Sequence, residues 1–343
     1  MIATLTRHVG AAPAGQDRTL RLDLLANPYA PAPAARKVLA FGAEPASPSD
    51  RLQSILTARL ARKHQVPMQS IILSSGASDL LRMFFESFAA VGPLHVFPPS
   101  DDDTHDLARQ FGCDLVVVPR DRSFHVGALD RFDRSSPSST AYVMSPNDPT
   151  GTQLQLQQAV QLARTVSRIV IDERHAGYAP RDHLPLCREF ENVILVRSLE
   201  AWGGLTKVPL AYAIASPMVA AEFQSRTADI GLDPASLLAG IATLESCRYL
   251  DASARQIARE RTDMIRGLRK LNMVRPLPSA ANFLLVRVER GERADLRRHL
   301  EEREITVHYP CQPGLQDTIR VSAVSQFATR SLTGALIDWA AGL

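Results

Sequence analysis

Short runs of apolar, β-branched residues alternate with segments of helical periodicity along most of this 343-residue chain. The strand-like runs are Ser70–Ser75, Leu94–Phe97, Leu115–Pro119, Ala141–Ser145, Ile169–Ile171, Val193–Val196 and Leu210–Ala215. Helical patterns lie between several of them, at Asp79–Ala90, Asp103–Phe111 and Leu154–Val166. This alternation is typical of an α/β fold in which a mainly parallel, doubly wound sheet is covered by helices on both faces.

The pattern changes near each end of the chain and predicts three parts. Residues 1–45 are rich in Pro and Ala, which indicates an extended N-terminal arm rather than a packed element. Residues 46–235 hold the alternating elements and are expected to form the large domain. A long helical region then leads to strand candidates at Asn282–Val288 and Thr318–Val324, so residues 236–343 are predicted to form a smaller C-terminal α/β domain.

Charge and cysteine usage exclude several classes of protein. The net charge is only +3, and basic residues alternate with acidic ones, which argues against nucleic-acid binding. The chain has neither a signal-peptide core nor an apolar run of membrane-spanning length. Four cysteines without CxxC spacing indicate free thiols in a reducing compartment; they are Cys113, Cys187, Cys247 and Cys311. A cytoplasmic protein is expected.

Six short motifs occur in an order that points to a known family. They are Leu25–Tyr29, Ser74–Ser78, Ser145–Gly151, Ile171–Glu173, Ala281–Leu285 and Ile319–Val321. Together, over roughly residues 22–340, they resemble fold-type I pyridoxal phosphate (PLP) enzymes. The resemblance is greatest to the group of histidinol-phosphate aminotransferase and threonine-phosphate decarboxylase.

This resemblance implies roles for particular residues. Asp172 would pair with the pyridine nitrogen of the cofactor and keep it protonated. The turn Gly76-Ala77-Ser78 would present helix N–H groups to the cofactor phosphate. Arg320 would clamp a substrate carboxylate, with Asn282 on the same substrate side. Because the family builds its site between subunits, the resemblance also implies a homodimer.

The chain departs from the family pattern at the positions that would hold the cofactor. Ala201 stands where the family has the Schiff-base lysine, and Glu200 and Pro209 replace a serine and an arginine that bind phosphate. The other replacements are Asp148 for the asparagine at the ring hydroxyl, His175 for a tyrosine, Asp101 for the stacking aromatic and Glu44 for a tyrosine of the other subunit. Most of these changes add negative charge.

Tight, conventional PLP binding is therefore not expected. A carboxylate at Glu200 about 5 Å from a phosphate would cost roughly 3 kcal/mol per charge pair at an effective dielectric near 20. Only four lysines could form an imine: Lys37, Lys63, Lys207 and Lys270. Lys207 is the nearest to Ala201 in sequence, but the downstream match leaves no gap that would move it inward.

These observations leave several functions open. The first hypothesis is a protein that works without PLP and binds, and in one version transforms, a small amino-acid-like molecule; Arg320 would hold its carboxylate and the acids Asp101, Asp148, Asp172 and Glu200 its amine. A divalent metal is a weaker reading of the same acids, so no metal is predicted; a decayed site with solvated acids is the alternative. The second hypothesis is a genuine PLP aminotransferase or decarboxylase that uses Lys207 or binds the cofactor non-covalently. The third is a non-catalytic subunit that completes the site of an active paralogue.

Three further side chains have two readings each. His175 could be a general base, although a hydrogen-bonded partner of a nearby acid is the preferred interpretation. His105 could share a helix face with Asp101, but solvent exposure is the default expectation. Trp202 could fill the vacated cofactor cavity or simply pack as a loop aromatic.

Overall fold

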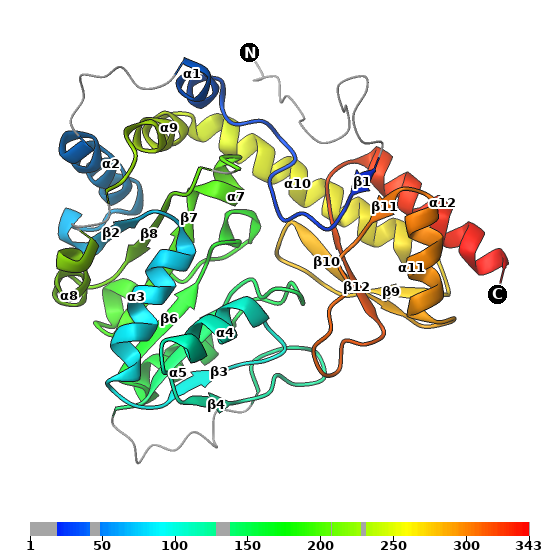
Figure 1. The fold of residues 1–343 in the computed structure, drawn as a ribbon, viewed down its shortest axis with the longest axis horizontal. Helices are drawn as coiled ribbons and strands as arrows, with labels where there is room; N and C mark the ends of the chain where they lie inside the picture. Colours follow the sequence, from blue (N-terminus) through cyan, green and yellow to red (C-terminus); the bar gives the residue numbers. More distant parts are fainter. Residues whose placement is uncertain (1–18, 42–48, 128–137, 207, 228–230, 343) are drawn as a thin grey trace.

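A seven-stranded sheet forms the centre of the larger part of the protein. The computed structural model describes residues 19–41, 49–127, 138–206, 208–227 and 231–342. In spatial order the strands are β2 (Ile71–Ser74), β8 (Ala211–Ile214), β7 (Val193–Ser198), β6 (Arg168–Asp172), β5 (Thr140–Met144), β3 (Leu94–Val96) and β4 (Leu115–Val117). Strand β8 runs antiparallel to both neighbours and the other pairings are parallel. The predicted mainly parallel sheet is confirmed (Figure 1).

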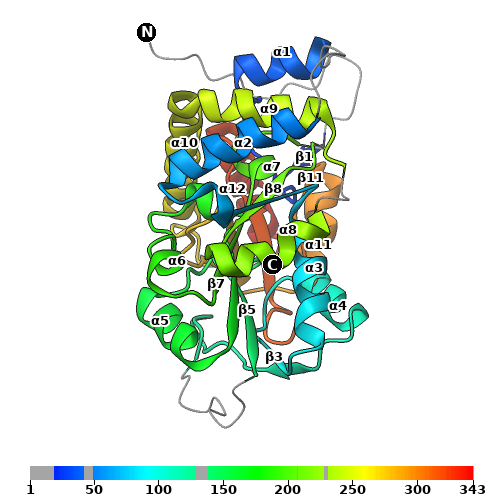
Figure 2. The same cartoon turned by 90° about the vertical axis from the view of Figure 1, so that its left-hand side faces the viewer.

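Helices cover both faces of this sheet (Figure 2). One face packs against α3 (Ala77–Ala89), α4 (Asp102–Gln110) and α8 (Pro217–Thr227), and the other against α2 (Ser49–His64), α5 (Leu156–Thr165), α6 (Leu186–Glu189) and α9 (Pro234–Glu245). Strand β6 shows why both faces need cover. Ile169 and Ile171 enter one core cluster and Val170 enters the other, and all three are fully buried.

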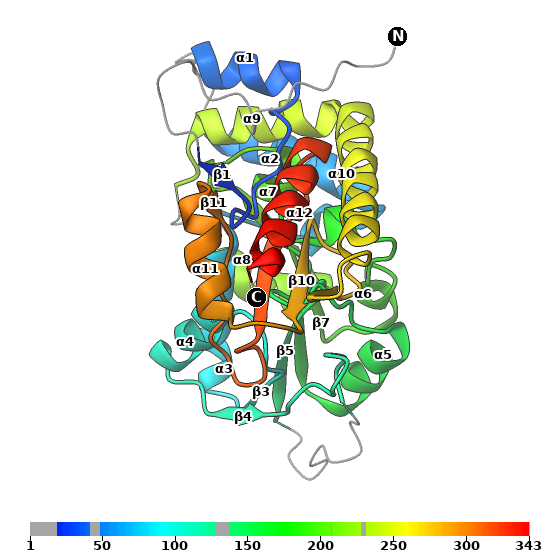
Figure 3. The same cartoon turned by 90° about the vertical axis from the view of Figure 1, so that its right-hand side faces the viewer.

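A second, three-stranded antiparallel sheet forms the C-terminal part (Figure 3). Its order is β12 (Thr318–Ser322), β10 (Phe283–Val288) and β9 (Val274–Pro276). Helices α11 (Arg293–Glu302) and α12 (Gln326–Ala341) share its core with the end of α10 (Cys247–Leu268), which runs alongside both parts (Figure 1). A short parallel pair, β1 (Leu20–Arg21) and β11 (Ile305–Thr306), joins the N-terminal segment to this region.

The N-terminal segment differs from the predicted extended arm. Residues Pro33–Phe41 form helix α1, which packs on α9. Pro33 stands in the first turn, where proline costs no hydrogen bond, and the following Ala-Ala-Arg-Lys-Val-Leu run is rich in helix formers. Composition alone misled the prediction because the prolines precede the helix. In the described ranges, no helix has the length and apolar character to cross a bilayer.

Candidate functional site

The parallel strands end at one edge of the large sheet, and most of the predicted site residues follow those ends. Asp172 closes β6, Asp148 lies beyond β5, and Asp101 lies beyond β3 at the start of α4. Glu200 and Ala201 follow β7 in the short helix α7 (Leu199–Gly203). Ligands of open α/β sheets bind outside these carboxyl ends, so the topology itself gathers the candidates.

The Asp172 carboxylate accepts four hydrogen bonds from residues of its own chain. Its side chain is 0% exposed. Its Oδ2 accepts hydrogen bonds from Tyr142 Oη at 2.9 Å, Arg174 Nε at 2.9 Å and Arg174 Nη2 at 2.6 Å, while Oδ1 accepts one from the Arg174 backbone N–H at 3.1 Å. Burial alone would raise the pKa of Asp172, but the Arg174 charge and these hydrogen bonds outweigh it and the pKa is lowered.

The same guanidinium also reaches Asp101. Arg174 Nη1 lies 3.7 Å from Asp101 Oδ2, which accepts a hydrogen bond from Thr104 Oγ1 at 2.6 Å. Burial raises the pKa of Asp101 despite the attraction of Arg174. Arg174 therefore lies between two of the predicted site acids, with its side chain 20% exposed.

Asp148 and Arg320 form a second buried ion pair, between the large sheet and the small one. Arg320 Nη1 donates to Asp148 Oδ1 at 2.7 Å and to Oδ2 at 2.6 Å. Arg320 Nη2 donates to the Asp23 carbonyl at 2.8 Å, and its guanidinium lies 5.5 Å from the Phe283 ring centroid. The predicted carboxylate clamp thus already holds a carboxylate, and that carboxylate is one of the acids predicted to meet an amine.

Glu200 and the Gly76 turn lie against each other. Gly76, with φ of 103°, precedes α3, whose first residues are Ala77 and the exposed Ser78. A Cβ at Gly76 would lie 3.6 Å from Glu200 Oε1 and 3.6 Å from Pro209 Cβ. Ser198 Oγ caps α7 by accepting from the Glu200 N–H at 3.0 Å. Burial raises the pKa of Glu200.

Two histidines depart from the sequence expectation. His175 is buried, its ring meets Phe283 edge-on at 5.6 Å between centroids, and its Nδ1 has no hydrogen-bond partner among the described residues. Burial lowers the pKa of His175 to about 4, so the ring is neutral at pH 7. His105 is also buried, at 5% exposure, and contacts Tyr142 edge-on; the expectation of solvent exposure was wrong because α4 turns this residue inward.

A cavity of about 550 Å³ adjoins these groups, within the range of small-molecule sites. Asp101, Asp148, Arg174, His175 and Arg320 line it; the other lining residues are Leu25, Asp103, Pro149, His308, Tyr309, Cys311 and Gln312. Neither Asp172 nor Glu200 is among them, so only two of the four predicted acids, Asp101 and Asp148, face this cavity. Asn282, which was predicted to lie on the substrate side, does not line the cavity; its Nδ2 donates to the Leu25 carbonyl at 2.8 Å and holds this part of the N-terminal segment.

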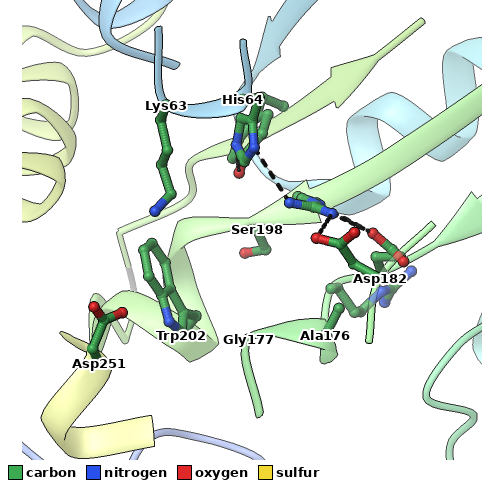
Figure 4. A pocket seen from close by; sticks show the side chains of 12 residues that line it. Lys63, His64, Ala176, Gly177, Asp182, Ser198, Trp202 and Asp251 are labelled. Atoms are coloured by element: carbon green, nitrogen blue, oxygen red, sulfur yellow. Dashed lines mark hydrogen bonds and ion pairs between the residues drawn. The ribbon is translucent and has the colours of Figure 1, made fainter. Parts of the chain in front are cut away.

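Trp202 lines a different cavity, of about 210 Å³ (Figure 4). Its ring packs on Gly177, where a Cβ would come within 2.3 Å of Trp202 Cδ1. Lys63 points toward Trp202 with Nζ 4.9 Å from the ring centroid (Figure 4). Trp202 therefore does not line the 550 Å³ cavity, although Arg174 lines both cavities. The Ala201 carbonyl accepts a hydrogen bond from Tyr178 Oη at 2.8 Å.

Comparison with known proteins identifies the family. The family profile described as "Aminotransferase class I and II" matches residues 28–336. The chain belongs to this family. The predicted resemblance to fold-type I PLP enzymes is confirmed by this match.

Named relatives lie in the same group. A histidinol-phosphate aminotransferase of Roseiflexus castenholzii is 28% identical over 319 residues, covering 89% of this chain and 85% of the relative. Histidinol-phosphate aminotransferase of Sinorhizobium meliloti, solved in complex with PLP, superposes with a TM-score of 0.80 at 24% identity, covering 93% of this chain and 90% of that one. L-threonine-O-3-phosphate decarboxylase of Porphyromonas gingivalis superposes with a TM-score of 0.76 at 17% identity, covering 93% of this chain and 98% of that one.

Some residues at the site of this aminotransferase-family chain were not predicted from its sequence. Arg174 follows Asp172 by two residues, so the sequence carried a signal: a cation close to the acid that the resemblance pairs with the pyridine nitrogen. Tyr309 and Gln312 come from the loop after β11 and carried none. Glu44 and Lys207, for which the sequence suggested roles, lie outside the described residues. Across the described residues no group of His, Cys, Asp or Glu is arranged to hold a metal ion.

Proposed function

We propose that this aminotransferase-family protein does not carry out lysine-dependent PLP chemistry and instead binds a small amino-acid-like molecule without PLP. The observation that carries the proposal is the buried ion pair in which the Arg174 guanidinium binds the Asp172 carboxylate. PLP, when bound in a member of this fold class, supplies an electron sink whose ring nitrogen needs a carboxylate partner. Here the carboxylate in that sequence position already accepts two hydrogen bonds from a guanidinium.

The residues present do not fit PLP at three further points. Ala201 has no amine with which to hold an aldehyde. Glu200 places a carboxylate beside the Gly76 turn, where the phosphate of the cofactor would need neutral or positive groups. Arg174 and Asp101 together fill the region next to Asp172 with a charged pair rather than with an aromatic face.

The 550 Å³ cavity supports the amino-acid-like ligand. It offers Arg320 for a carboxylate and the acids Asp101 and Asp148 for an ammonium group. His175, neutral at pH 7, can donate or accept a hydrogen bond there. Of the three predicted catalytic residues, only His175 lines this cavity and is a candidate for chemistry there; Asp172 is buried against Arg174, and Glu200 lies at the Gly76 turn. We also propose a homodimer and a cytoplasmic location, which gel filtration and cell fractionation test.

The decisive experiment adds PLP to the purified protein, removes free cofactor by gel filtration and treats the sample with borohydride. We expect no retained near-visible absorption and no reduced adduct on any lysine by peptide mass mapping. An adduct at Lys63, Lys207 or another lysine would refute the proposal and identify a PLP enzyme. Co-purification with a lysine-bearing paralogue would instead favour the role of a partner subunit.

Restoring the family residue tests the physical reason. Ala201→Lys alone should gain little cofactor, because Arg174 still occupies Asp172. The double variant Ala201→Lys with Arg174→Ala should retain at least about tenfold more PLP, a gain of about 1.4 kcal/mol. Ala201→Lys with Arg275→Ala is the matched control, because Arg275 forms an exposed pair with Glu289 and neither residue lines the cavity. Equal retention by both double variants would contradict the assigned role of Arg174.

A further inference from the structure

Several residues that line the cavity beside Asp148 and Arg320 have buried polar atoms without hydrogen-bond partners. His175 is 4% exposed and Arg320 is 7% exposed. His175 Nδ1 and Arg320 Nε have no hydrogen-bond partner within the described part of the chain, and neither have Tyr309 Oη and Gln312 Oε1. All four residues line the same cavity. Buried polar groups are nearly always satisfied, so this concentration of unsatisfied ones indicates a polar ligand.

We infer that the Asp148–Arg320 pair is a placeholder that a zwitterionic ligand exchanges: the ligand's carboxylate takes Arg320 and its ammonium group takes Asp148. This inference rests on the proposed function and specifies how the ligand is recognised. The pair suits such an exchange because its two members come from different sheets. Asp148 follows β5 of the large sheet and Arg320 belongs to β12 of the small one.

Charge counting explains why the ligand must carry both groups. Before binding, Arg320 Nη1 contacts both Asp148 oxygens, at 2.7 and 2.6 Å. After exchange with a zwitterion, each of the two buried charges again has an opposite charge. A simple carboxylate would leave Asp148 without a partner, and a simple amine would leave Arg320 without one. Leaving one member of a buried pair unpaired is strongly unfavourable.

The surrounding charges favour the same orientation. Asp101, Asp103 and Asp148 line the cavity together with the cations Arg174 and Arg320, so the acids exceed the arginines by one and favour an ammonium group beside Asp148. Arg320 Nη2 is held by the Asp23 carbonyl at 2.8 Å, which fixes the guanidinium while its carboxylate partner changes. His175 and Tyr309 offer further hydrogen bonds to the remainder of the ligand.

The test compares matched probes by calorimetry: alanine, propionate and ethylamine; phenylalanine, hydrocinnamate and phenethylamine; histidine, imidazolepropionate and histamine. For wild-type protein we expect at least one amino acid to bind, and its des-amino and decarboxylated analogues to bind at least about 100-fold more weakly. Equal binding of an amino acid and its des-amino analogue would overturn the exchange.

The variant Asp148→Asn gives a result that a purely structural ion pair would not. It frees Arg320 from its internal competitor, so the des-amino carboxylate should bind at least about tenfold more tightly than to wild type. The parent amino acid should bind more weakly, because its ammonium loses Asp148. Glu289→Gln, in the exposed pair with Arg275, is the control and should change neither affinity. Circular dichroism confirms that each variant is folded.

The outcomes separate the two proposals. If no probe binds wild type, the amino-acid-like ligand of the proposed function fails, and the exchange with it. If amino acids bind but Asp148→Asn weakens amino acid and carboxylate alike, only the exchange is wrong. The wild-type comparison of analogues needs no variant, so the exchange stays refutable even if Asp148→Asn does not fold.

Discussion

Replacing Arg174 by methionine should reveal how strongly the protein depends on the cation beside Asp172. Methionine keeps an unbranched side chain and removes the charge. Asp172 would retain only the Tyr142 hydroxyl and one backbone N–H as donors. Breaking a buried pair from one side costs about 3–5 kcal/mol, and we take about 3 because these two donors remain. For 343 residues the unfolding entropy is about 0.7 kcal/mol/K, so Tm should fall by about 4 °C.

The loss should depend on pH in a definite direction. In wild type the folded pKa of Asp172 is below its ordinary value, so its contribution is present above that ordinary value and is lost only as pH falls through the folded pKa. In Arg174→Met, burial without the guanidinium raises the pKa of Asp172. Stability is then lost as pH rises above the unfolded value. The deficit should therefore be larger near pH 8 than near pH 5, measured by urea unfolding at each pH.

Two controls make this reasoning refutable. Arg275→Met removes an exposed arginine and should change the free energy of unfolding by less than about 0.5 kcal/mol. Adding Asp172→Asn to Arg174→Met removes the stranded charge and should recover part of the loss. A deficit below about 1 kcal/mol, or one that is the same at both pH values, would show that Arg174 is not the counter-ion on which Asp172 depends.

Gly177→Ala would push a Cβ to within 2.3 Å of Trp202 Cδ1; we expect a displaced indole with altered fluorescence and a loss of about 1–3 kcal/mol, and an unchanged emission spectrum would contradict the packing. His64 is 4% exposed, and burial, followed by the charge of Arg197, lowers its pKa to about 3. Its neutral form is thus favoured by folding, so stability is complete above the unfolded pKa of about 6.5 and falls by up to about 1.4 kcal/mol per pH unit below it. The His64 ring proton shift should not titrate between about pH 7 and 5, and an ordinary titration there would refute the assignment.

The sequence was most informative where structure depends on local pattern. The apolar runs ending near Met144, Asp172 and Ser198 predicted three parallel strands, because strands buried on both faces are continuously apolar. Helix α1 was missed because prolines nearby suggested an extended chain. Strand β9, only three residues long, has too short an apolar pattern to be recognised.

The candidate site was predictable as a set of positions but not as a set of partners. The motifs indicated which residues gather at the sheet edge. They could not indicate that Arg320 contacts Asp148, 172 residues earlier in the chain, because such a contact depends on how two sheets meet. Nor could they indicate that Arg174 turns back onto Asp172, since the direction of a long side chain depends on its surroundings.

The guanidinium beside Asp172 has a consequence for how the protein is maintained. A fold that relies on a diffusible cofactor gains stability in proportion to the logarithm of that compound's concentration, and weakens when supply falls. Arg174 is covalently part of the chain, so its contribution is the same in a starved cell as in a well-fed one. Under the proposed function, in which no PLP is bound, the stability of the fold therefore does not depend on vitamin availability.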